Sequence, residues 1–456
     1  MKTIIQLSEK YSKSGPRYTS YPTAPHFSNH FSCKHWEDEL LQSQNKGRDL
    51  SIYLHIPFCD TLCYYCGCHM LASKKYDRAA EYLALLSKEI SLMARLTSSK
   101  REVHQIHWGG GTPTFLVPAD IRRLASTVYE NFSVSSDAEI SCEVDPRNLT
   151  WDHIAALSES GFNRVSLGVQ DLDPRVQNSI NRIQSESLVR NVYDWMRKKG
   201  FKSVNMDLMV GLPHQSVESF SITLDKVLSM APDRLAIFNY AHLPHLIKHQ
   251  KLIHNEELPT LHTRLELHRM ISDRLSAAGY IDIGMDHFAK ADDDLVKARE
   301  SKTLWRNFQG YTTHKQCDLY GFGISGISQT EDVYAQNVKT IEGYRERVNS
   351  GKMATERGLR VSLDDKIRRD AIMQIMCEGE LNILNFSRKW TIDFAAYFSE
   401  VYPELNHLEA EGLIKNSVES IKVTEFGHIF LRNIAMVFDA YLKKPDTEMK
   451  TYSQTL

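Results

Sequence analysis

Three cysteines with the spacing Cys59-x-x-x-Cys63-x-x-Cys66 are the residues of this chain best suited to chemistry, and a short apolar run directly precedes them. Thiolate sulfur is a preferred ligand of iron–sulfur iron, and three thiolates this close together can hold three irons of a cubane [4Fe–4S] cluster. A full set of four cysteines would leave no iron open. Here the fourth iron is free to chelate S-adenosylmethionine through its amino and carboxylate groups and to cleave it reductively.

The alternatives for these cysteines are a zinc site and a disulfide. A structural zinc site usually has two separated cysteine or histidine pairs, and no second pair follows this loop. A disulfide is disfavoured because the apolar part of the first residues is far shorter than a secretory signal. Cys68 lies two residues beyond Cys66, and we expect it near the cluster without ligating it.

Length and charge restrict the class of protein. The chain has 456 residues, 42% of them hydrophobic, and a formal net charge of −2. Such a chain can bury a large core in two or three domains. No basic block favours nucleic acid or an anionic membrane, and no apolar run approaches the roughly 20 residues that span a bilayer. We therefore expect a monomeric cytoplasmic enzyme with no nucleic-acid or membrane partner.

Strand-like and helix-like segments alternate over much of the chain. Helices with apolar residues at three- and four-residue spacing are predicted over 78–95, 120–131, 185–199, 217–230 and 263–278. Strands are predicted over 51–57, 103–108, 138–144, 164–169, 203–210, 234–239 and 280–285. This alternation indicates parallel strands joined by right-handed crossovers, so functional residues are expected at the carboxyl ends of the strands, as in β/α barrels.

Chemically distinctive residues do follow these strands in turn. The cysteine loop follows the first, and the later ones are Gly109–Gly111, Glu143 to Asp145, Gln170, Asp207 and residues 239–242. Glycines let a ligand approach the backbone where no Cβ intervenes, although Thr112-Pro113 also suits an ordinary helix start. The sequence therefore predicts one functional rim.

Two later regions are interpreted differently. Residues 321–326 match G-x-G-x-x-G, but they lie late in the chain and outside a clear βαβ unit, so we expect a bend presenting backbone to an adenine ring. After about residue 340 the pattern becomes mainly helical, with helices over 363–377, 392–398, 404–411 and 429–441 around a strand at 421–423. We predict an N-terminal arm (1–48), a β/α barrel (49–335) and a mainly helical C-terminal domain (336–456).

The cysteine spacing is typical of the radical SAM superfamily, and the chain resembles the bacterial oxygen-independent coproporphyrinogen III oxidase family along nearly its whole length. The matching segments are residues 14–23, 59–68, 107–113, 143–146, 168–170, 211–213, 238–244, 284–289 and 307–313. This resemblance implies an α/β fold with a partial, incomplete parallel β/α barrel.

The resemblance implies two bound S-adenosylmethionine molecules. Family contacts to the molecule on the cluster match Tyr53, Gly110, Glu143 and Ile327. Contacts to the second molecule match Tyr65, Gly111, Thr112, Gln170, Arg182, Asp207 and Ala241. Carboxylates can accept from ribose hydroxyls or an ammonium group, and arginine can pair with a carboxylate, although Arg182 taken alone would suit a surface salt bridge.

The implied reaction is the oxidative decarboxylation of two propionates of coproporphyrinogen III to vinyl groups, giving protoporphyrinogen IX in haem biosynthesis. A reduced flavodoxin- or ferredoxin-like donor would supply an electron, and a 5′-deoxyadenosyl radical would abstract hydrogen from the propionate β-carbon. Tyr53 and Cys68 are the expected catalytic residues. For the carboxylates of the substrate we expect cationic and hydroxyl side chains, with candidates Arg17, Tyr18, Thr19, Tyr21, Arg306 and Tyr311.

Two departures from the family pattern concern the cysteine loop. Tyr65 stands where phenylalanine is common, which keeps the ring and adds a hydroxyl that needs a partner. His69-Met70 stands where Asn-Lys is common, so a cation that can influence the cluster potential is missing.

Three other functions remain as alternatives. A haem-carrying chaperone of the same superfamily would typically lack Gly67-Cys68 and the arm residues 17–21, and both are present. An iron–sulfur electron-transfer protein does not need a whole barrel. A haem-degrading radical SAM methyltransferase is the third.

Overall fold

A curved sheet dominates the computed structural model, which describes residues 4–443 and 452–455. The strand order is β16-β15-β14-β13-β1-β4-β5-β6-β7-β8-β10-β9. In this order every pair from β13 to β8 is parallel, and β14, β15 and β16 join antiparallel beyond β13. The parallel strands are β1 (Leu50–Ile56), β4 (Glu102–Gly110), β5 (Ser133–Val144), β6 (Arg164–Gln170), β7 (Ser203–Val210), β8 (Arg234–Asn239) and β13 (Asp318–Phe322). Six of these strands are those predicted from the alternating pattern.

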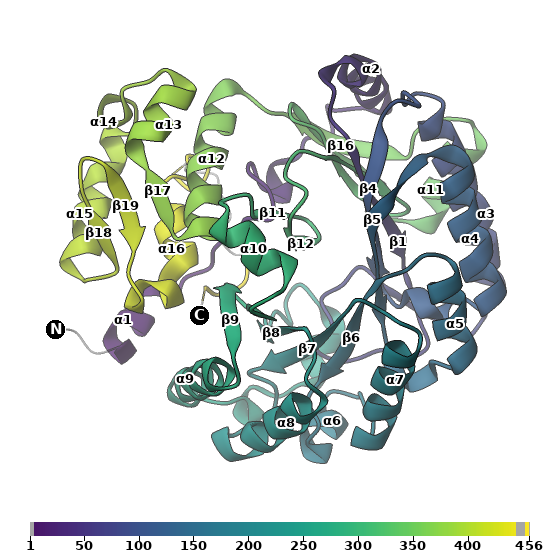
Figure 1. Ribbon diagram of the computed structural model, residues 1–456, viewed down its shortest axis with the longest axis horizontal. Helices are drawn as coiled ribbons and strands as arrows, with labels where there is room; N and C mark the ends of the chain where they lie inside the picture. Colours follow the sequence, from purple (N-terminus) through teal and green to yellow (C-terminus); the bar gives the residue numbers. More distant parts are fainter. Residues whose placement is uncertain (1–3, 444–451, 456) are drawn as a thin grey trace.

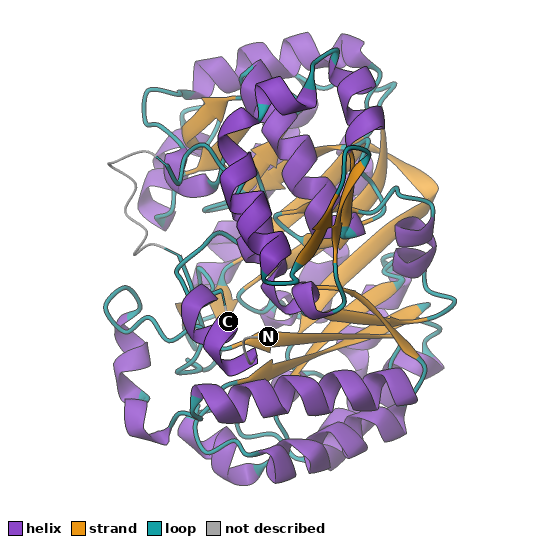
Figure 2. Cartoon of the chain, turned by 90° about the vertical axis from the view of Figure 1, so that its left-hand side faces the viewer, coloured by secondary structure: helices purple, strands orange, loops and turns teal. Residues whose placement is uncertain are grey.

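Helices cover the outer face of the parallel strands (Figures 1 and 2). They are α3 (Asp77–Ala94), α4 (Pro118–Asn131), α5 (Trp151–Glu159), α6 (Pro174–Ser179), α7 (Glu186–Lys198), α8 (Val217–Met230) and α9 (Leu261–Ala277). The predicted helices are confirmed to within a few residues, and α5 and the short α6 were missed. Leu86, Ile121, Val192 and Leu224 are buried against the sheet from this layer, as the apolar spacing requires.

The seventh predicted strand does not continue the parallel set. β9 (Tyr280–Gly284) pairs antiparallel with β10 (His287–Lys290), which pairs antiparallel with β8. The reversal occurs at Met285, which has φ of 48°, in a two-residue turn too short for a crossover helix. The prediction of a parallel strand here was therefore wrong in direction, although its residues do form a strand.

The barrel is open, as the partial-barrel prediction requires. The sheet order ends at β16 (Thr355–Arg360) on one side and β9 on the other, with β14 (Ile327–Gln329) and β15 (Val333–Asn337) before β16. Residues 336–360, which were expected in the C-terminal domain, supply the end of β15, α11 (Ile341–Asn349) and β16. Tyr344, Val348 and Met353 belong to the barrel core, so the second domain starts near residue 363.

The C-terminal domain is mainly helical and has its own apolar core (Figure 1). It contains α12 (Leu363–Glu378), α13 (Ile383–Trp390), α14 (Phe394–Tyr397), α15 (Tyr402–Ala410) and α16 (Leu431–Met436), with a small sheet of β17 (Glu380–Asn382), β19 (Ser420–Val423) and β18 (Ile414–Asn416). That core also takes residues from α10 (Asp294–Glu300) and β12 (Gly310–Thr312), and β11 (Trp305–Asn307) contacts α12. The segment 283–311 thus joins the two domains.

The N-terminal arm contacts both domains. Leu7 and Tyr11 of α1 (Ile4–Tyr11) pack in the C-terminal core, and the Tyr11 ring centroid lies 5.5 Å from that of Phe430. Trp36 and Leu40 of α2 (Cys33–Ser43) pack in the barrel core. The arm is therefore part of the folded body. Among the described residues, no helix is both long and apolar enough to cross a membrane.

A buried carboxylate fastens the bend at residues 321–326 to the barrel. Glu89 of α3 accepts hydrogen bonds from the Gly323 N–H (2.7 Å), the Tyr344 hydroxyl (2.6 Å) and Asn337 Nδ2 (2.6 Å). Gly323 has φ of +88°, and a Cβ there would collide with the Tyr82 hydroxyl. Burial raises the pKa of Glu89 to about 7, although these three hydrogen bonds act to lower it.

This raised pKa predicts a pH-dependent contribution to stability. Because the pKa of Glu89 is higher in the folded protein than its ordinary value of 4.5, its stabilising effect is full below about pH 4.5 and is lost as pH rises to about 7. Glu89→Gln removes the titration. The melting temperature of Glu89→Gln relative to the unsubstituted protein should therefore rise between pH 5 and pH 8, measured by calorimetry at both values. A constant difference would contradict the buried, titrating carboxylate.

Candidate active site

The cysteine loop follows β1, and hydrogen bonds to its main chain hold it from two sides. Tyr64 N–H donates to the Ile180 carbonyl (3.0 Å), and Asn181 Nδ2 donates to the Leu62 carbonyl (2.8 Å). On the other side, two side chains of the segment after β8 donate to the loop. Gln250 Nε2 donates to the Tyr65 carbonyl (2.9 Å), and His249 Nε2 donates to the Cys66 carbonyl (2.7 Å). The loop is thus fixed before any ligand binds.

The thiols of this loop lie in different electrostatic surroundings. Burial raises the pKa of Cys59 to about 12, even though Thr112 Oγ1 lies 3.3 Å from its sulfur. A hydrogen bond from Cys68 lowers the pKa of Cys66 to about 7. Cys63 Sγ accepts hydrogen bonds from Arg147 (3.3 Å) and Arg182 (3.6 Å). Hydrogen bonds to a ligand sulfur help to set the reduction potential of a cluster.

The three thiols are not arranged around a single ion. No group of three His, Cys, Asp or Glu side chains in residues 4–443 and 452–455 is close enough to hold one metal. A zinc ion needs all its sulfur ligands about 2.3 Å from one centre. A multi-iron cluster instead places its cysteine ligands around several metal atoms.

Glu143, at the end of β5, faces the glycine bend after β4. It accepts a hydrogen bond from the Gly110 N–H (3.1 Å), and His107 Nε2 lies 3.4 Å from its other oxygen. Burial acts to raise its pKa, but His107 and the Gly110 N–H outweigh burial and leave that pKa below its ordinary value. A Cβ on Gly109 would lie 2.9 Å from the carboxylate, so glycine is required for this approach.

Tyr53 on β1 is oriented by a chain of hydrogen bonds. Its hydroxyl lies 3.0 Å from His55 Nδ1, and His55 Nε2 lies 2.8 Å from the His69 carbonyl, so the ring donates through Nε2 and accepts from Tyr53. The Tyr53 ring also stacks on His107, with centroids 5.9 Å apart. His69 in turn donates to the Lys339 carbonyl (2.8 Å), so this departure from the family pattern ties the loop to the segment after β15.

Arg182 is buried and is no surface residue. It pairs with Asp145 (3.0 Å) and donates to the Gly168 carbonyl (2.6 Å). Burial acts to raise the pKa of Asp145, but Arg182 and Arg147 outweigh it and bring that pKa to about 2. The carboxylate therefore stays charged and holds Arg182 beside Cys63.

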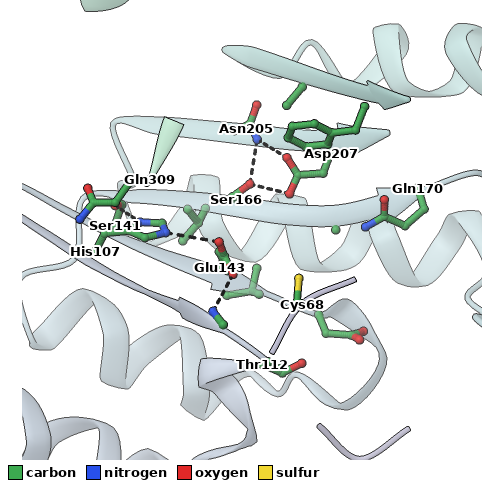
Figure 3. Close-up of a pocket in the computed structure, with 18 of the residues that line it drawn as sticks. Cys68, His107, Thr112, Ser141, Glu143, Ser166, Gln170, Asn205, Asp207 and Gln309 are labelled. Atoms are coloured by element: carbon green, nitrogen blue, oxygen red, sulfur yellow. Dashed lines mark hydrogen bonds and ion pairs between the residues drawn. The ribbon is translucent and has the colours of Figure 1, made fainter. Parts of the chain in front are cut away.

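Asp207 on β7 lies across the cavity from Glu143 (Figure 3). It accepts from Ser166 Oγ (2.7 Å) and Asn205 Nδ2 (2.7 Å). Burial raises its pKa to about 6, and the charge of Glu143 adds to that effect. Two carboxylates on one cavity can bind a cationic ligand or several hydroxyl groups between them.

The predicted cofactor residues line two adjoining cavities. A cavity of about 430 Å³ is bordered by most of them: Cys59, Cys63, Cys66, Cys68, Tyr65, Gly110, Gly111, Thr112, Glu143, Gln170, Arg182 and Asp207. Tyr53 and Ile327 border a second cavity of about 330 Å³, and Gln309 borders both. Ala241 borders neither, but its carbonyl accepts from Gln250 (3.1 Å) beside the cysteine loop.

The substrate candidates are less uniformly placed. Tyr311 borders the larger cavity, and Arg306 lies behind it with its Cζ 4.8 Å from the Tyr311 ring centroid. Arg17 pairs with Asp286 and lies over the Phe238 ring. Tyr18 and Tyr21 are fully buried in the C-terminal core, where Tyr18 donates to Asp439 (2.9 Å) and the Ala440 N–H donates to the Tyr21 hydroxyl (3.0 Å). Thr19 lies between them in the sequence and borders neither cavity.

Comparison with known proteins bears on this site directly. Residues 53–227 match the model of the radical SAM superfamily. The chain is 43% identical over 452 residues to the oxygen-independent coproporphyrinogen III oxidase of Pseudomonas aeruginosa, covering 99% of this chain and 98% of that protein. For the same enzyme of Helicobacter pylori, identity is 40% over the full length of both chains.

The chain belongs to the oxygen-independent coproporphyrinogen III oxidase family.

A solved structure supports the same family. The coproporphyrinogen III oxidase of Escherichia coli, described as a radical SAM enzyme, superposes with a TM-score of 0.91 at 42% identity, covering 97% of this chain and 99% of that one. The radical SAM fold with a helical C-terminal region is thus confirmed.

Several polar residues of this oxidase-family site were not predicted from the sequence. His107, Ser141, Ser166, Asn205 and Gln309 all border the larger cavity (Figure 3). The first four lie on β4 to β7, and each is an even number of residues before a predicted rim residue on the same strand. Because side chains alternate between the two faces of a strand, they point to the same inner face as the predicted residues. This two-residue alternation was the available signal for these four. For Gln309, in the β11–β12 turn, the signal was its place in the matching segment 307–313.

The loop geometry predicts distinct roles for two cysteines of this family member. Cys63→Ser should abolish cluster assembly after anaerobic reconstitution, because alkoxide is a poor ligand for iron–sulfur iron. Cys68→Ser is the matched control and should retain the cluster. Iron and sulfide content and visible absorbance check both variants. Normal iron in Cys63→Ser, or its loss in Cys68→Ser, would show that the ligands are misassigned.

Proposed function

We propose that this protein catalyses the anaerobic oxidative decarboxylation of two propionates of coproporphyrinogen III, giving protoporphyrinogen IX in haem biosynthesis. The observation that carries the proposal is similarity to curated oxidases across practically the whole of both chains. The cavity bordered by the cysteine loop supports it, because it adjoins polar and cationic residues suited to a carboxylated substrate.

Each reacting propionate loses a hydrogen atom from its β-carbon, carbon dioxide and one electron, and a vinyl group remains. A [4Fe–4S] cluster on Cys59, Cys63 and Cys66, with S-adenosylmethionine bound to it, would supply the carbon-centred radical that removes the hydrogen atom. The chain itself must hold these groups, orient the substrate and exclude water from the cavity.

The first S-adenosylmethionine is assigned to Tyr53, Gly110, Glu143 and Ile327. Glu143 has acceptor capacity beyond its bond to the Gly110 N–H, so it can bind an ammonium group or a hydroxyl. Ile327 follows the bend that Glu89 fastens, and it shares a cavity with Tyr53. An apolar side chain and an aromatic ring on one cavity suit an adenine base.

A second S-adenosylmethionine is assigned to Tyr65, Gly111, Thr112, Gln170, Arg182, Asp207 and Ala241. The separation of Glu143 and Asp207 onto different strands gives the cavity two acidic positions rather than one. Arg182 still has a buried Nε without a partner among the described residues, so it can pair with a ligand carboxylate in addition to Asp145.

Tyr53 and Cys68 are proposed as catalytic residues. The Tyr53 hydroxyl is held by His55, whose own tautomer is fixed by the His69 carbonyl. Cys68 borders the main cavity and keeps its proton, because its hydrogen bond to Cys66 and the negative charge of that thiolate raise its pKa. Both therefore present a protonated group beside the reacting space.

The electron source is proposed to be a reduced flavodoxin- or ferredoxin-like protein in the cytoplasm, acting on a monomer. Lys248 and Lys251 are exposed on the segment whose neighbours His249 and Gln250 bond the cysteine loop. Exposed cations beside the loop would favour the approach of an acidic carrier.

The second binding site predicts a change in stoichiometry. Asp207→Asn keeps an acceptor for Ser166 but removes the charge, so it should weaken the second S-adenosylmethionine about tenfold or more. Equilibrium dialysis of reconstituted protein should then find one tightly bound molecule instead of two. Glu143→Gln is the matched variant and should weaken the molecule on the cluster, seen as loss of its effect on the electron paramagnetic resonance of the reduced cluster. Two tight sites in Asp207→Asn would contradict the assignment.

The proposed reaction is tested under strict anaerobiosis with reconstituted protein, coproporphyrinogen III, S-adenosylmethionine and a reductant. Carbon dioxide and the divinyl product should appear together with methionine and 5′-deoxyadenosine. Tight stoichiometric haem binding without decarboxylation would instead support the chaperone function.

A further inference from the structure

Three buried side-chain nitrogens on one side of the main cavity have no hydrogen-bond partner among the described residues. They are Arg234 Nη2, His287 Nδ1 and Arg306 Nη1. Buried N–H groups are nearly always hydrogen-bonded in folded proteins, and leaving one unpaired is costly. Three such donors together indicate an acceptor that the chain does not itself supply.

These donors belong to one continuous wall. β8 and β10 pair antiparallel, with His287 opposite Ala236 and Ala289 opposite Arg234, so Arg234, His287 and Phe238 border the same cavity. The His287 ring centroid lies 5.7 Å from that of Phe238 and 5.3 Å from that of Tyr311. Arg306 stacks behind Tyr311.

The charges of this wall are not balanced. Arg17 pairs with Asp286, Arg234 Nε with Asp293 (2.8 Å), and Arg164 with Glu139 (2.8 Å) and Asp294 (2.5 Å). Arg306 is 3% exposed, and its Nε donates to the Arg17 carbonyl (3.2 Å). It forms no ion pair with a described carboxylate, and Asp286, which is near enough to attract it, is already paired with Arg17. A buried guanidinium without a counter-ion of its own is costly.

His287 contributes a donor without adding charge. Burial and the neighbouring Arg306 lower its pKa to about 3. The imidazole is therefore neutral at physiological pH, with one ring N–H available to donate. The aromatic rings of Phe238 and Tyr311 beside it give the wall apolar surface as well.

We propose that Arg234, His287 and Arg306, with Phe238 and Tyr311, form a carboxylate subsite that binds one propionate of the substrate and packs against its pyrrole ring. This inference rests on the proposed function for the identity of the carboxylate. Arg234 and His287 donate to it directly, and Arg306 supplies the uncompensated positive charge behind them. Arg234 lies at the amino end of β8, whereas the cysteine loop follows the carboxyl end of β1, so the subsite fixes how far the substrate extends along the strands.

The test uses the full chain with its cluster reconstituted. Arg306→Met and His287→Phe keep the side-chain volume and remove, respectively, the charge and the ring donor. Each should raise the KM for coproporphyrinogen III about tenfold or more, and direct anaerobic binding by ultrafiltration should weaken in parallel. The S-adenosylmethionine stoichiometry should not change. Arg306→Lys, which keeps the charge, should recover part of the loss.

Stability separates a binding role from a structural one. Arg101 is similarly buried, at 4% exposed, but it pairs with Asp318 (2.6 Å). Arg101→Met should therefore lower the melting temperature, because it leaves the buried Asp318 carboxylate with only Arg48 of its two arginine partners. Arg306→Met should leave the melting temperature unchanged or raise it, because it removes a charge without a counter-ion.

Unchanged substrate affinity in Arg306→Met and His287→Phe, or a fall in melting temperature in Arg306→Met like that of Arg101→Met, would overturn the proposal. If the unsubstituted protein decarboxylates the substrate and both variants bind it with unchanged affinity, the subsite is refuted and the proposed function stands. Binding of coproporphyrinogen III that weakens in the variants, without any decarboxylation, would support the subsite and refute the proposed function.

Discussion

Parallel pairing of β1 with its two neighbours is the constraint on which the rest of the structure depends. Tyr53 lies opposite His107 on β4 and opposite Gly321 on β13. Since parallel strands end at the same edge of a sheet, this register brings together the cysteine loop, the glycine bend and the bend at residues 321–326. Each of these segments comes from a distant part of the sequence, and none could form the site without the others.

The interior of the barrel is unusually polar because it holds groups for ligands as well as for packing. Three carboxylates here have different partners. Glu143 has a main-chain N–H and His107, and Asp207 has two neutral side chains. Asp145 has two arginines. Burial of each carboxylate would otherwise favour its neutral form. The cavity thus combines one firmly charged acid behind the cysteine loop with two that face the open space.

The connection between the two domains completes the far wall of the cavity. Segment 283–311 contributes His287 and Tyr311 to the cavity and also packs in the C-terminal core, where the Tyr311 hydroxyl donates to the Met376 carbonyl (2.9 Å). The arm is held to this body by Arg432, which donates to the carbonyls of Gly15 and Pro16. Tyr18 and Tyr21 are core residues, whereas Arg17 lies over the ring of Phe238, which borders the cavity, and pairs with Asp286.

The sequence by itself determined the cysteine loop, six of the parallel strands and most of the covering helices, since these depend on local spacing and periodicity. Through the resemblance, it also identified residues such as Glu143 and Asp207 that border the cavity. Only the tertiary structure decided that β9 runs antiparallel, that residues 336–360 extend the barrel sheet, and that Tyr18 and Tyr21 are buried away from the cavity. It alone brought Arg234, His287 and Arg306 to one wall. Strand direction, burial and the pairing of charges depend on contacts between residues far apart in the chain, and no local pattern encodes them.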